Sequence, residues 1–568
     1  MNCAPTQAEN TRCRQKMGVG KNPGLLDKSH HHGNNSPVME GVSEQAESNP
    51  GRRIWLAALV ALLLLNAGLR LVRLQADSPS LAGPFRNVAP YKDEGEKAYE
   101  ARNRVLFGQW QTHPADNFRF WRVQSPVWTY TLVLVFKALG VHYSSMRLVS
   151  ILSALVILLA GSRLLQRAGF QLGAIFLPVI LGLNLYFLVY TRLGLMEPMM
   201  LAWVSLSAWF LAESQKEPGR FIPASLFFLA AIFTKQSALL FAPIWAGSGL
   251  RLLRPRREQN RTGESRANLL ALGAGVLIVA LPCLLALLNP DFRALVDMNF
   301  RHGFHVTEEE EMTTAGGRLA LIAASFSPEN LWQGFFLTLP SASLFGIAWM
   351  ISILRRAAKK REVQFFEWML LTWFGIGRLA AVSTPHQVAR FHLFYFVPLS
   401  LLAAMSLERL WRARSADPSG RWKRIAGRGL VAAALIYELL MTALPWAQWV
   451  KNPRYDLLDA SRRLGEVLAG EEKSLGRTPV VIGEWAGPLS LENRMLLYYV
   501  KGPFNQSREQ LQAFGITHLL ESTNRYDPGA GRFAKLFPET YAPKQKVAEL
   551  KVRGRELTLW RLPPQPAP

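Results

Sequence analysis

Repeated apolar runs of membrane-spanning length constrain this chain more than any other feature of its sequence. A helix that crosses a bilayer needs roughly 20 mainly apolar residues, and runs near that length recur between residues 54 and 444. The sequence therefore predicts a polytopic α-helical membrane protein with about eleven transmembrane helices. The predicted spans are Ile54–Leu74, Ser145–Leu164, Leu172–Tyr190, Pro198–Leu211, Ile222–Phe233, Ala238–Leu252, Asn268–Leu288, Leu331–Leu354, Phe365–Val382, Phe391–Leu410 and Gly429–Leu444.

Basic residues set the orientation of these spans. The formal charge of +24 comes from Lys and Arg clusters between the apolar runs, which indicates topology and not a nucleic-acid-binding face. Arg52 and Arg53 precede the first run and place the N-terminus in the cytoplasm. The run Pro126–Gly140 is short and contains Lys137. If it lies in the membrane interface, every later basic cluster faces the cytoplasm, and this is the arrangement we expect.

Composition divides the chain into three parts. Residues 1–50 are polar and are expected to form a disordered cytoplasmic tail. Residues 51–447 form the transmembrane domain, with an outer loop at residues 75–126. Residues 448–568 have no spanning run and predict a small soluble α/β domain outside the cytoplasm. Its predicted elements are strand Pro479–Trp485, helix Ser490–Val500, helix Arg508–Phe514, strand Gly515–Leu520 and a hairpin of Val547–Val552 with Glu556–Leu562.

Metal and disulfide signals are weak. Two of the three cysteines lie in the tail and Cys283 lies in an apolar run, so neither a disulfide framework nor a cysteine metal site follows. Three adjacent histidines, His30 to His32, could bind a metal, but in a flexible tail they are more often incidental.

Polar residues gather at the outer ends of the predicted spans. The first outer loop carries Asp93 and Glu94, which are expected at the outer membrane surface. In isolation this stretch also fits an ordinary solvated loop, and the cations could simply extend toward the interface. The other outer residues are Arg192, Glu197, Lys235, Arg378, His386, Arg390 and His392.

Carboxylates and cations on one side suit a reaction of a lipid-linked phosphate. We expect Lys235, Arg192, Arg390 and His386 to bind the phosphate, because an anion near hydrocarbon needs close positive charge. Asp93 then acts as general base on an incoming hydroxyl, with Lys92 and Lys97 favouring its ionised form; Glu197 is the competing base. A Mg or Mn ion held by Asp93 and Glu197 is a further hypothesis, although two carboxylates form an incomplete shell.

Five sequence blocks in order resemble a known family. They are DEGEKAYEARNRVLFGQW, SPVWTYTLVLVFKALGV leading into MRLVSILSALVILLAGSRLL, RLGLMEP, FTKQSALLFAP and VARFHLFYFVPLSLLAA. Together they are similar to the GT-C type glycosyltransferases that use polyprenyl-phosphate sugars, in the bacterial branch related to protein O-mannosyltransferases and the lipid A aminoarabinose transferase. The resemblance covers about residues 54 to 410.

The resemblance implies roles for individual residues. Asp93 matches the catalytic acidic residue and Glu94 its partner, while Lys235 falls in a Thr-Lys block near the lipid phosphate. Two departures stand out. Glu197 stands where the family commonly has Asp, and Gln124-Ser125-Pro126 replaces a Lys-Pro-Pro motif, so that one phosphate contact is lost or comes from Arg119 or Arg122.

The expected function is transfer of a sugar from a polyprenyl-phosphate donor to a glycan, lipid or protein of the envelope, on the outer face of the cytoplasmic membrane. Membrane lipid is the surrounding partner and nucleic acid is not expected. The main alternative is a non-enzymatic transporter or flippase of polyprenyl-linked glycans, which should carry ionisable groups along a path near mid-membrane. A sensor with a ligand-binding C-terminal domain is a third reading, in which Asp93 would be dispensable.

Overall fold

Helices dominate the computed structural model, which describes residues 50–79, 89–253, 262–304, 338–383, 389–412, 420–501, 504–522 and 544–563. Residues Ile54–Pro568 form one compact unit by their contacts. The predicted tail up to residue 49, the acidic run Glu308–Glu311 and His386 lie outside the described residues.

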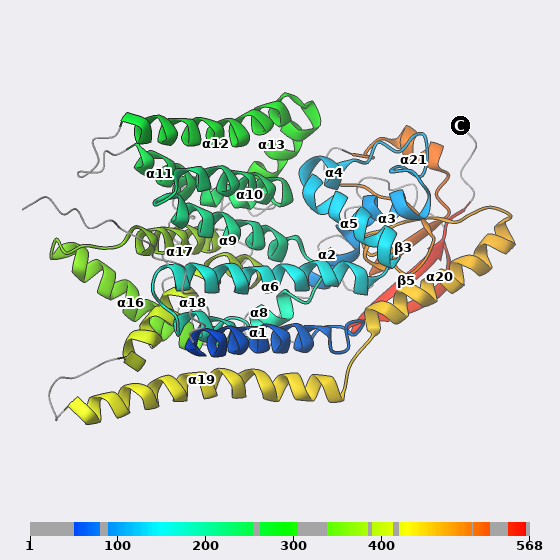
Figure 1. Ribbon diagram of the computed structural model, residues 1–568. Helices are drawn as coiled ribbons and strands as arrows, with labels where there is room; N and C mark the ends of the chain where they lie inside the picture. Colours follow the sequence, from blue (N-terminus) through cyan, green and yellow to red (C-terminus); the bar gives the residue numbers. More distant parts are fainter. Residues whose placement is uncertain are drawn as a thin grey trace, which may run out of the picture. The chain divides into compact units, whose positions relative to one another are not determined.

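The predicted spans coincide with a set of packed helices (Figure 1). Helix α9 packs against α6 and α10, and α10 packs against α12. Helices α16 and α17 each pack against α18. The helices at these predicted spans are α1 (Pro50–Leu71), α6 (Tyr143–Arg167), α9 (Met196–Ser214), α10 (Phe221–Thr234), α11 (Ala242–Leu252), α12 (Thr262–Leu288), α16 (Pro340–Ala358), α17 (Phe365–Ser383), α18 (Ala389–Arg412) and α19 (Gly420–Lys451); α10 and α11 are shorter than a full span.

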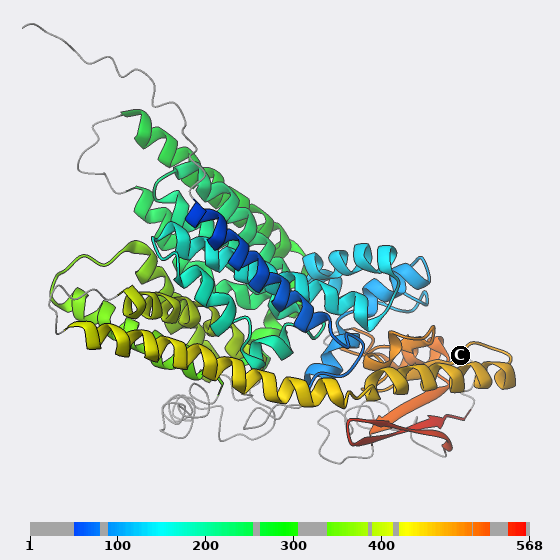
Figure 2. The same ribbon diagram turned by 60° about the horizontal axis from the view of Figure 1, so that its bottom comes forward.

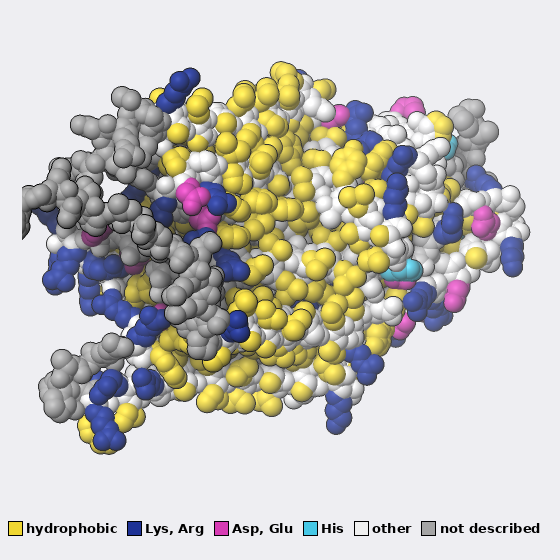
Figure 3. Space-filling model, in the orientation of Figure 1, with side chains coloured by type: hydrophobic (Ala, Val, Ile, Leu, Met, Phe, Trp, Pro, Cys, Tyr) yellow, Lys and Arg dark blue, Asp and Glu magenta, His cyan; other side chains and the backbone are white. Residues whose placement is uncertain are grey.

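Apolar side chains cover the outside of these helices. Figure 3 shows a broad hydrophobic surface over the helices, with Lys and Arg concentrated toward their ends. On α12, Leu270, Leu277 and Leu284 are 61–65% exposed, which in a soluble protein would be a large unburied patch. Among the described residues, six segments are long and apolar enough to cross a membrane: Arg53–Leu71, Tyr143–Arg167, Ser265–Leu288, Phe365–Val382, Arg390–Arg412 and one within Arg421–Leu475. The chain is therefore a multi-pass membrane protein, and the remaining predicted spans are shorter or less apolar helices.

One predicted span, Leu172–Tyr190, is broken in the structure. It consists of α7 (Gly173–Ile180) and α8 (Leu185–Tyr190), separated by a turn. The side-chain oxygen of Asn184 accepts hydrogen bonds from the backbone N–H groups of Tyr186 and Phe187 at 3.1 and 3.2 Å. This N-cap starts a new helix where the sequence pattern predicts continuity.

Short helices form the segment between α1 and α6. They are α2 (Ala89–Glu96), α3 (Tyr99–Leu106), α4 (Phe120–Gln124) and α5 (Pro126–Leu139). Helix α5 has 14 residues, fewer than a span requires, and packs against α3, α6 and α10. A further helix, α13 (Pro290–Phe304), begins the predicted loop after α12 and packs against α4. Two 3₁₀ helices, η1 (Pro218–Arg220) and η2 (Gln236–Phe241), flank α10.

The C-terminal region combines a mixed sheet with helices, as predicted. Helix α19 continues to Lys451, beyond the expected boundary at residue 447, and α20 (Asp456–Leu475) then packs against strand β4 (Figure 2). The sheet order is β2-β1-β3-β5-β4, with β2, β1 and β3 parallel. The elements are β1 (Val480–Ile482), η5 (Pro488–Ser490), β2 (Leu496–Tyr498), α21 (Arg508–Phe514), β3 (His518–Ser522), β4 (Gln545–Val552) and β5 (Arg555–Arg561).

The predicted helix Ser490–Val500 is wrong. Its second half forms strand β2, paired with β1, and its first half belongs to a turn after η5. A short apolar run can form a buried strand or a buried helix, and periodicity does not separate the two. The predicted hairpin is confirmed: Arg553 and Gly554 both have positive φ, at 51° and 78°, as a tight hairpin turn requires.

Candidate active site

Four of the predicted site residues line one cavity of about 830 Å³. Asp93 lies in the last turns of α2, and Glu197 lies in the first turn of α9. Lys235 follows the last residue of α10, and Arg390 lies at the start of α18. Segments that are far apart in the sequence therefore present two carboxylates and two cations to a common space.

Arg390 lies between the two carboxylates. Its Nη1 forms a close ion pair with Oδ2 of Asp93, and its Nε lies 3.1 Å from Oε1 of Glu197. The ammonium of Lys235 donates to Oε1 of Glu197 at 2.6 Å, and Lys97 Nζ lies 3.5 Å from Oδ2 of Asp93. Oε2 of Glu197 is buried and has no hydrogen-bond partner among the described residues. Since buried polar atoms are rarely left unpaired, this oxygen is available for a hydrogen-bond donor from a bound molecule.

The two carboxylates differ in accessibility. The side chain of Asp93 is 16% exposed and that of Glu197 is 3% exposed. The ammonium of Lys235 and the guanidinium of Arg390 also lie 5.1 and 5.5 Å from the ring of Phe391, within the range of cation–π attraction. The cations are thus fixed on one wall, while Asp93 is the carboxylate that a solute reaches more readily.

The remaining walls are largely apolar. They include the side chains of Met196, Met200 and Leu240 from the helices, with Phe120 and Trp121 from α4. An apolar cavity with a few converging charged groups is the usual form of a binding site for an amphiphilic ligand.

The C-terminal region contributes a cation that sequence reasoning missed. Lys501 and Gln506 line the cavity, and Lys501 pairs with Glu96 of α2, 405 residues away in the sequence. Its ammonium lies 4.7 Å from the ring centre of Trp121 and 5.3 Å from that of Phe120. Burial lowers the pKa of Lys501. No local pattern in the sequence marks this lysine, because its importance comes from a contact with α2 and α4.

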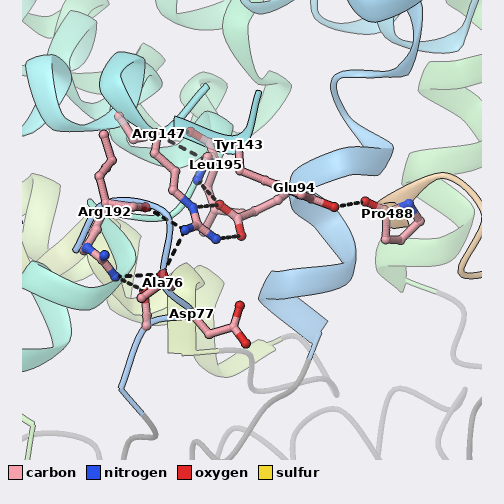
Figure 4. Close-up of polar contacts among 12 residues, drawn as sticks. Ala76, Asp77, Glu94, Tyr143, Arg147, Arg192, Leu195 and Pro488 are labelled. Atoms are coloured by element: carbon pink, nitrogen blue, oxygen red, sulfur yellow. Dashed lines mark hydrogen bonds and ion pairs between the residues drawn. The ribbon is translucent and has the colours of Figure 1, made fainter. Parts of the chain in front are cut away.

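Glu94 is fully buried and does not line the cavity. Figure 4 shows this carboxylate with its hydrogen-bond partners. Arg147 donates from Nε and Nη2 to its two oxygens at 2.9 and 2.8 Å, and the backbone N–H of Gly194 donates at 2.7 Å. The Nη1 of Arg147 also donates to the carbonyls of Leu74 and Ala76 at 2.8 Å. This bidentate, fully hydrogen-bonded pair fixes α2 against α6 and the end of α1. The structure therefore places Glu94 in a supporting position, away from its predicted catalytic role.

Arg192 also lies away from the cavity, in the group drawn in Figure 4. Its guanidinium donates to the backbone carbonyls of Arg70, Val72 and Ala76 at 3.2–3.3 Å. The ring of Trp449 lies 4.3 Å from its central carbon. These partners occupy the guanidinium, so Arg192 holds the chain that leaves α1 and is not placed to bind the phosphate as predicted. His386, the other predicted phosphate ligand, lies outside the described residues.

The C-terminal region holds the α2–α4 segment in place. The Nε of Arg102 donates to the carbonyl of Ser490 at 2.8 Å, and its Nη2 donates to those of Asn493 and Met495 at 2.9 Å. The hydroxyl of Tyr99 donates to the carbonyl of Leu497 at 2.9 Å. Helix α3 is therefore anchored to the C-terminal region, and α2, which carries Asp93 and directly precedes α3, packs against η5 of the same region.

Glu100 organises the start of α4 from within this segment. Its Oε2 accepts hydrogen bonds from the backbone N–H groups of Trp121 and Arg122 at 2.6 and 2.9 Å. Burial raises the pKa of Glu100 to about 7. A carboxylate at this helix N-terminus is electrostatically favourable, and it fixes the two aromatic rings of α4 that line the cavity.

The described side chains do not fit the divalent-cation site suggested by the sequence. No group of three or more His, Cys, Asp and Glu side chains gathers among the described residues. The space between Asp93 and Glu197 holds the guanidinium of Arg390, which pairs with both carboxylates. A Mg²⁺ ion is ordinarily bound by one or two carboxylates together with waters and substrate phosphates, so an ion between Asp93 and Glu197 would have to displace the guanidinium of Arg390.

Comparisons with known proteins identify the fold. No protein-family model and no curated protein sequence matches this chain. Among solved structures, ArnT from Cupriavidus metallidurans bound to undecaprenyl phosphate matches with a TM-score of 0.54 and 13% identity, over 89% of this chain and 98% of that chain. The same protein in its apo state gives 0.54 and 14%, over 90% and 98%.

An archaeal oligosaccharyltransferase has a similar structure. AglB from Archaeoglobus fulgidus, in complex with an inhibitory peptide and a dolichol-phosphate, matches with a TM-score of 0.53 and 14% identity, over 84% of this chain and 70% of that chain. Coverage of this extent includes both the membrane helices and the C-terminal region. The chain therefore has the GT-C membrane fold predicted from its sequence.

Proposed function

We propose that this chain is a membrane glycosyltransferase that moves a sugar from a polyprenyl-phosphate donor to an acceptor hydroxyl. The carrying observation is the cavity in which Asp93 and Glu197 meet Lys97, Lys235 and Arg390 at the ends of the helices. The likeness in fold to ArnT bound to undecaprenyl phosphate supports a lipid phosphate as the ligand of these cations. The apolar walls suit the first isoprene units of such a lipid.

The reaction needs one base and one stabilised leaving group. The acceptor oxygen forms a bond to the anomeric carbon of the donor, and the bond from that carbon to the phosphate oxygen breaks. The electron pair leaves with the phosphate, while the acceptor proton moves to the carboxylate of Asp93. Attack opposite the leaving phosphate inverts the anomeric centre. Cations at the phosphate stabilise the charge that develops there.

Binding of the donor prepares Asp93 for this role. In the structure Asp93 is paired with Arg390 and Lys97, and an ion-paired carboxylate is a poor base. A phosphate that enters between them competes for the same two cations. The donor therefore draws positive charge from Asp93 and makes the carboxylate more basic when the substrate is in place.

Glu197 serves better as an orienting group than as the base. Its Oε1 is held by Lys235 and Arg390, while its free Oε2 faces no described hydrogen-bond donor. A sugar hydroxyl would satisfy this buried oxygen and fix the donor ring relative to Asp93. Orientation of this kind lowers the barrier by pre-arranging the reacting atoms.

The position of the charged groups favours an enzyme over a flippase. Asp93, Glu197, Lys235 and Arg390 all lie at helix ends or in the adjoining segments. A transport path is expected to carry ionisable groups near mid-membrane. Convergence at one end suits a reaction at the membrane surface, with Asp93 facing the outside of the cytoplasmic membrane.

The test is transfer by the purified protein from a synthetic polyprenyl-phosphate sugar. Asp93→Asn removes the base with little change in shape, so the rate should fall by roughly two to four orders of magnitude. Glu197→Gln should lower kcat less than Asp93→Asn does, and it should raise the KM for the donor more. Near-normal turnover in Asp93→Asn would remove Asp93 from the base role, and the larger kcat loss in Glu197→Gln would assign the base to Glu197.

A deletion strain identifies the sugar and the acceptor class. The envelope glycans, lipids and proteins of the strain are compared with those of its parent by mass spectrometry. Loss of one sugar from one component, restored by the wild-type chain but not by the Asp93→Asn variant, is the expected result. Loss of a whole glycan from the envelope, with its lipid-linked form accumulated on the cytoplasmic side of the membrane, would support the flippase.

A further inference from the structure

The cavity contains a fourth cation that the proposed reaction has not used. Lys501 lies in the C-terminal region just after β2, in a backbone bridge with Phe504. It lines the cavity together with Gln506. Its side chain is 29% exposed, so the ammonium is neither fully buried nor free in solvent.

The surroundings of Lys501 hold its ammonium toward the cavity. The rings of Phe120 and Trp121 lie within 5.3 Å of its nitrogen, and Glu96 pairs with it from α2. Burial lowers the pKa of Lys501, and the nearby charges of Lys97 and Arg390 lower it further. The positive charges of Lys501, Lys97 and Arg390 repel one another, so together they favour an anion in the space between them.

The cations expected near this wall from the sequence lie elsewhere. Arg119 is paired with Asp291 at 2.6 Å. Arg122 lies 3.6 Å from Glu100 and over the ring of Trp110. The wall beside them presents the neutral side chains of Gln124 and Ser125 to the cavity. Lys501 is thus the cation that the structure places against α4.

We infer that Lys501 binds the phosphate that leaves the sugar, and that the C-terminal region thereby supplies a residue of the active site. This inference rests on the proposed function. The donor is a phosphodiester with one negative charge, whereas the released lipid phosphate is a monoester with a charge of about −1.5 to −2. A further cation at the phosphate therefore stabilises the leaving group more than the donor, which raises the rate of transfer.

Glu96 gives Lys501 a resting partner. In the structure the ammonium is paired with this carboxylate, and the phosphate competes for it as charge develops. An ammonium carries three donors on a flexible stem, so it can contact a phosphate oxygen while it stays near Glu96.

The experiment measures equilibrium binding to the purified full-length protein in detergent micelles by calorimetry. Two probes are used: a short-chain polyprenyl monophosphate, and the methyl phosphodiester of the same lipid. Lys501→Gln should weaken monophosphate binding by about tenfold to a hundredfold, the range for a hydrogen bond to a charged group. It should weaken phosphodiester binding by a clearly smaller factor, and Lys501→Arg should restore most of the monophosphate affinity.

Lys544→Gln is the matched control. Lys544 pairs with Glu521 at 2.7 Å and lies 4.6 Å from the ring centre of Trp560, so it makes the same two kinds of contact in the same region without lining the cavity. The Lys544→Gln variant should bind both lipids as the wild type does. Its melting temperature should change by about as little as that of Lys501→Gln.

The outcomes separate this inference from the proposed function. If the wild type binds neither lipid, the proposed function fails. If the wild type binds both lipids and Lys501→Gln binds the monophosphate equally well, Lys501 is not a phosphate ligand. Equal loss of both lipids in Lys501→Gln, with no recovery in Lys501→Arg and a lowered melting temperature, would show a purely structural lysine and also overturn the inference.

Discussion

A single added methyl group at Gly95 tests whether the C-terminal region positions helix α2, which carries the proposed base Asp93. Gly95 lies in α2, two residues after Asp93. A Cβ at this position would lie 2.3 Å from the carbonyl oxygen of Pro488 and 2.8 Å from that of Gly487, where ordinary contacts begin at 3.4 Å. Both neighbours are backbone atoms, so the contact cannot be relieved by a side-chain rotation.

The expected size of the effect follows from that distance. Gly95→Ala must separate α2 from η5 by roughly 1 Å, and overpacking of this kind costs about 1–3 kcal/mol of stability. The same displacement moves Asp93, and a 1 Å misplacement of a catalytic group costs about a hundredfold in rate. We expect kcat to fall by about that factor in a variant that still inserts and folds.

The assay is steady-state transfer from a synthetic donor, with thermal unfolding measured in parallel. Gly470→Ala is the control, because a Cβ at Gly470 in α20 meets no atom within 4 Å; its activity should equal that of the wild type. Unchanged kcat and unchanged melting temperature in Gly95→Ala would refute the close approach of α2 to Pro488. A lowered melting temperature with unchanged kcat would refute the positioning argument alone.

Three further predictions concern the donor, metals and topology. Lys235→Ala removes the cation 2.6 Å from Glu197 and should weaken donor binding by about tenfold or more at a normal protein level; unchanged affinity would exclude Lys235 from the phosphate site. Chelation with EDTA should leave transfer unchanged, since Arg390 occupies the space between the carboxylates, and a loss reversed by Mg²⁺ or Mn²⁺ would contradict this. Reporter fusions after residues 260, 360 and 420 should lie in the cytoplasm and those after residues 110, 305 and 480 outside it; an outside signal at 260 would break the proposed topology.

The sequence predicts the fold better than it predicts the individual site residues. Hydropathy and basic clusters locate most helices, because the bilayer imposes one length and one polarity on every span. The same reasoning brings Asp93, Glu197, Lys235 and Arg390 to one side, since Asp93 lies in the first outer loop and the other three lie at the outer ends of apolar runs. Hydropathy does not distinguish a polar residue that lines the cavity from one that is buried among hydrogen-bond partners elsewhere in the protein.

Glu94 and Arg192 show why that distinction needs the structure. Both lie in polar stretches beside site residues, yet Glu94 is bound by Arg147 and Arg192 by backbone carbonyls of residues 70–76. Lys501 shows the opposite case, because it joins the cavity through a contact with Glu96 that lies 405 residues away. The prediction of a helix at Ser490–Val500 was wrong because a short apolar run fits a helix or a strand equally well. Pairing with β1 makes part of this run a strand.

The ion pair between Glu96 and Lys501 also sets an order of events during biosynthesis. The helices from α1 to α19 precede Lys501 in the chain, so they can pack against one another before the cavity receives Lys501 and Gln506. A polypeptide that ends before β2 carries Asp93, Glu197, Lys235 and Arg390 but lacks the lysine that pairs with Glu96. Under the proposed function, transfer therefore begins only when the last region of the chain has folded against α2 and α4.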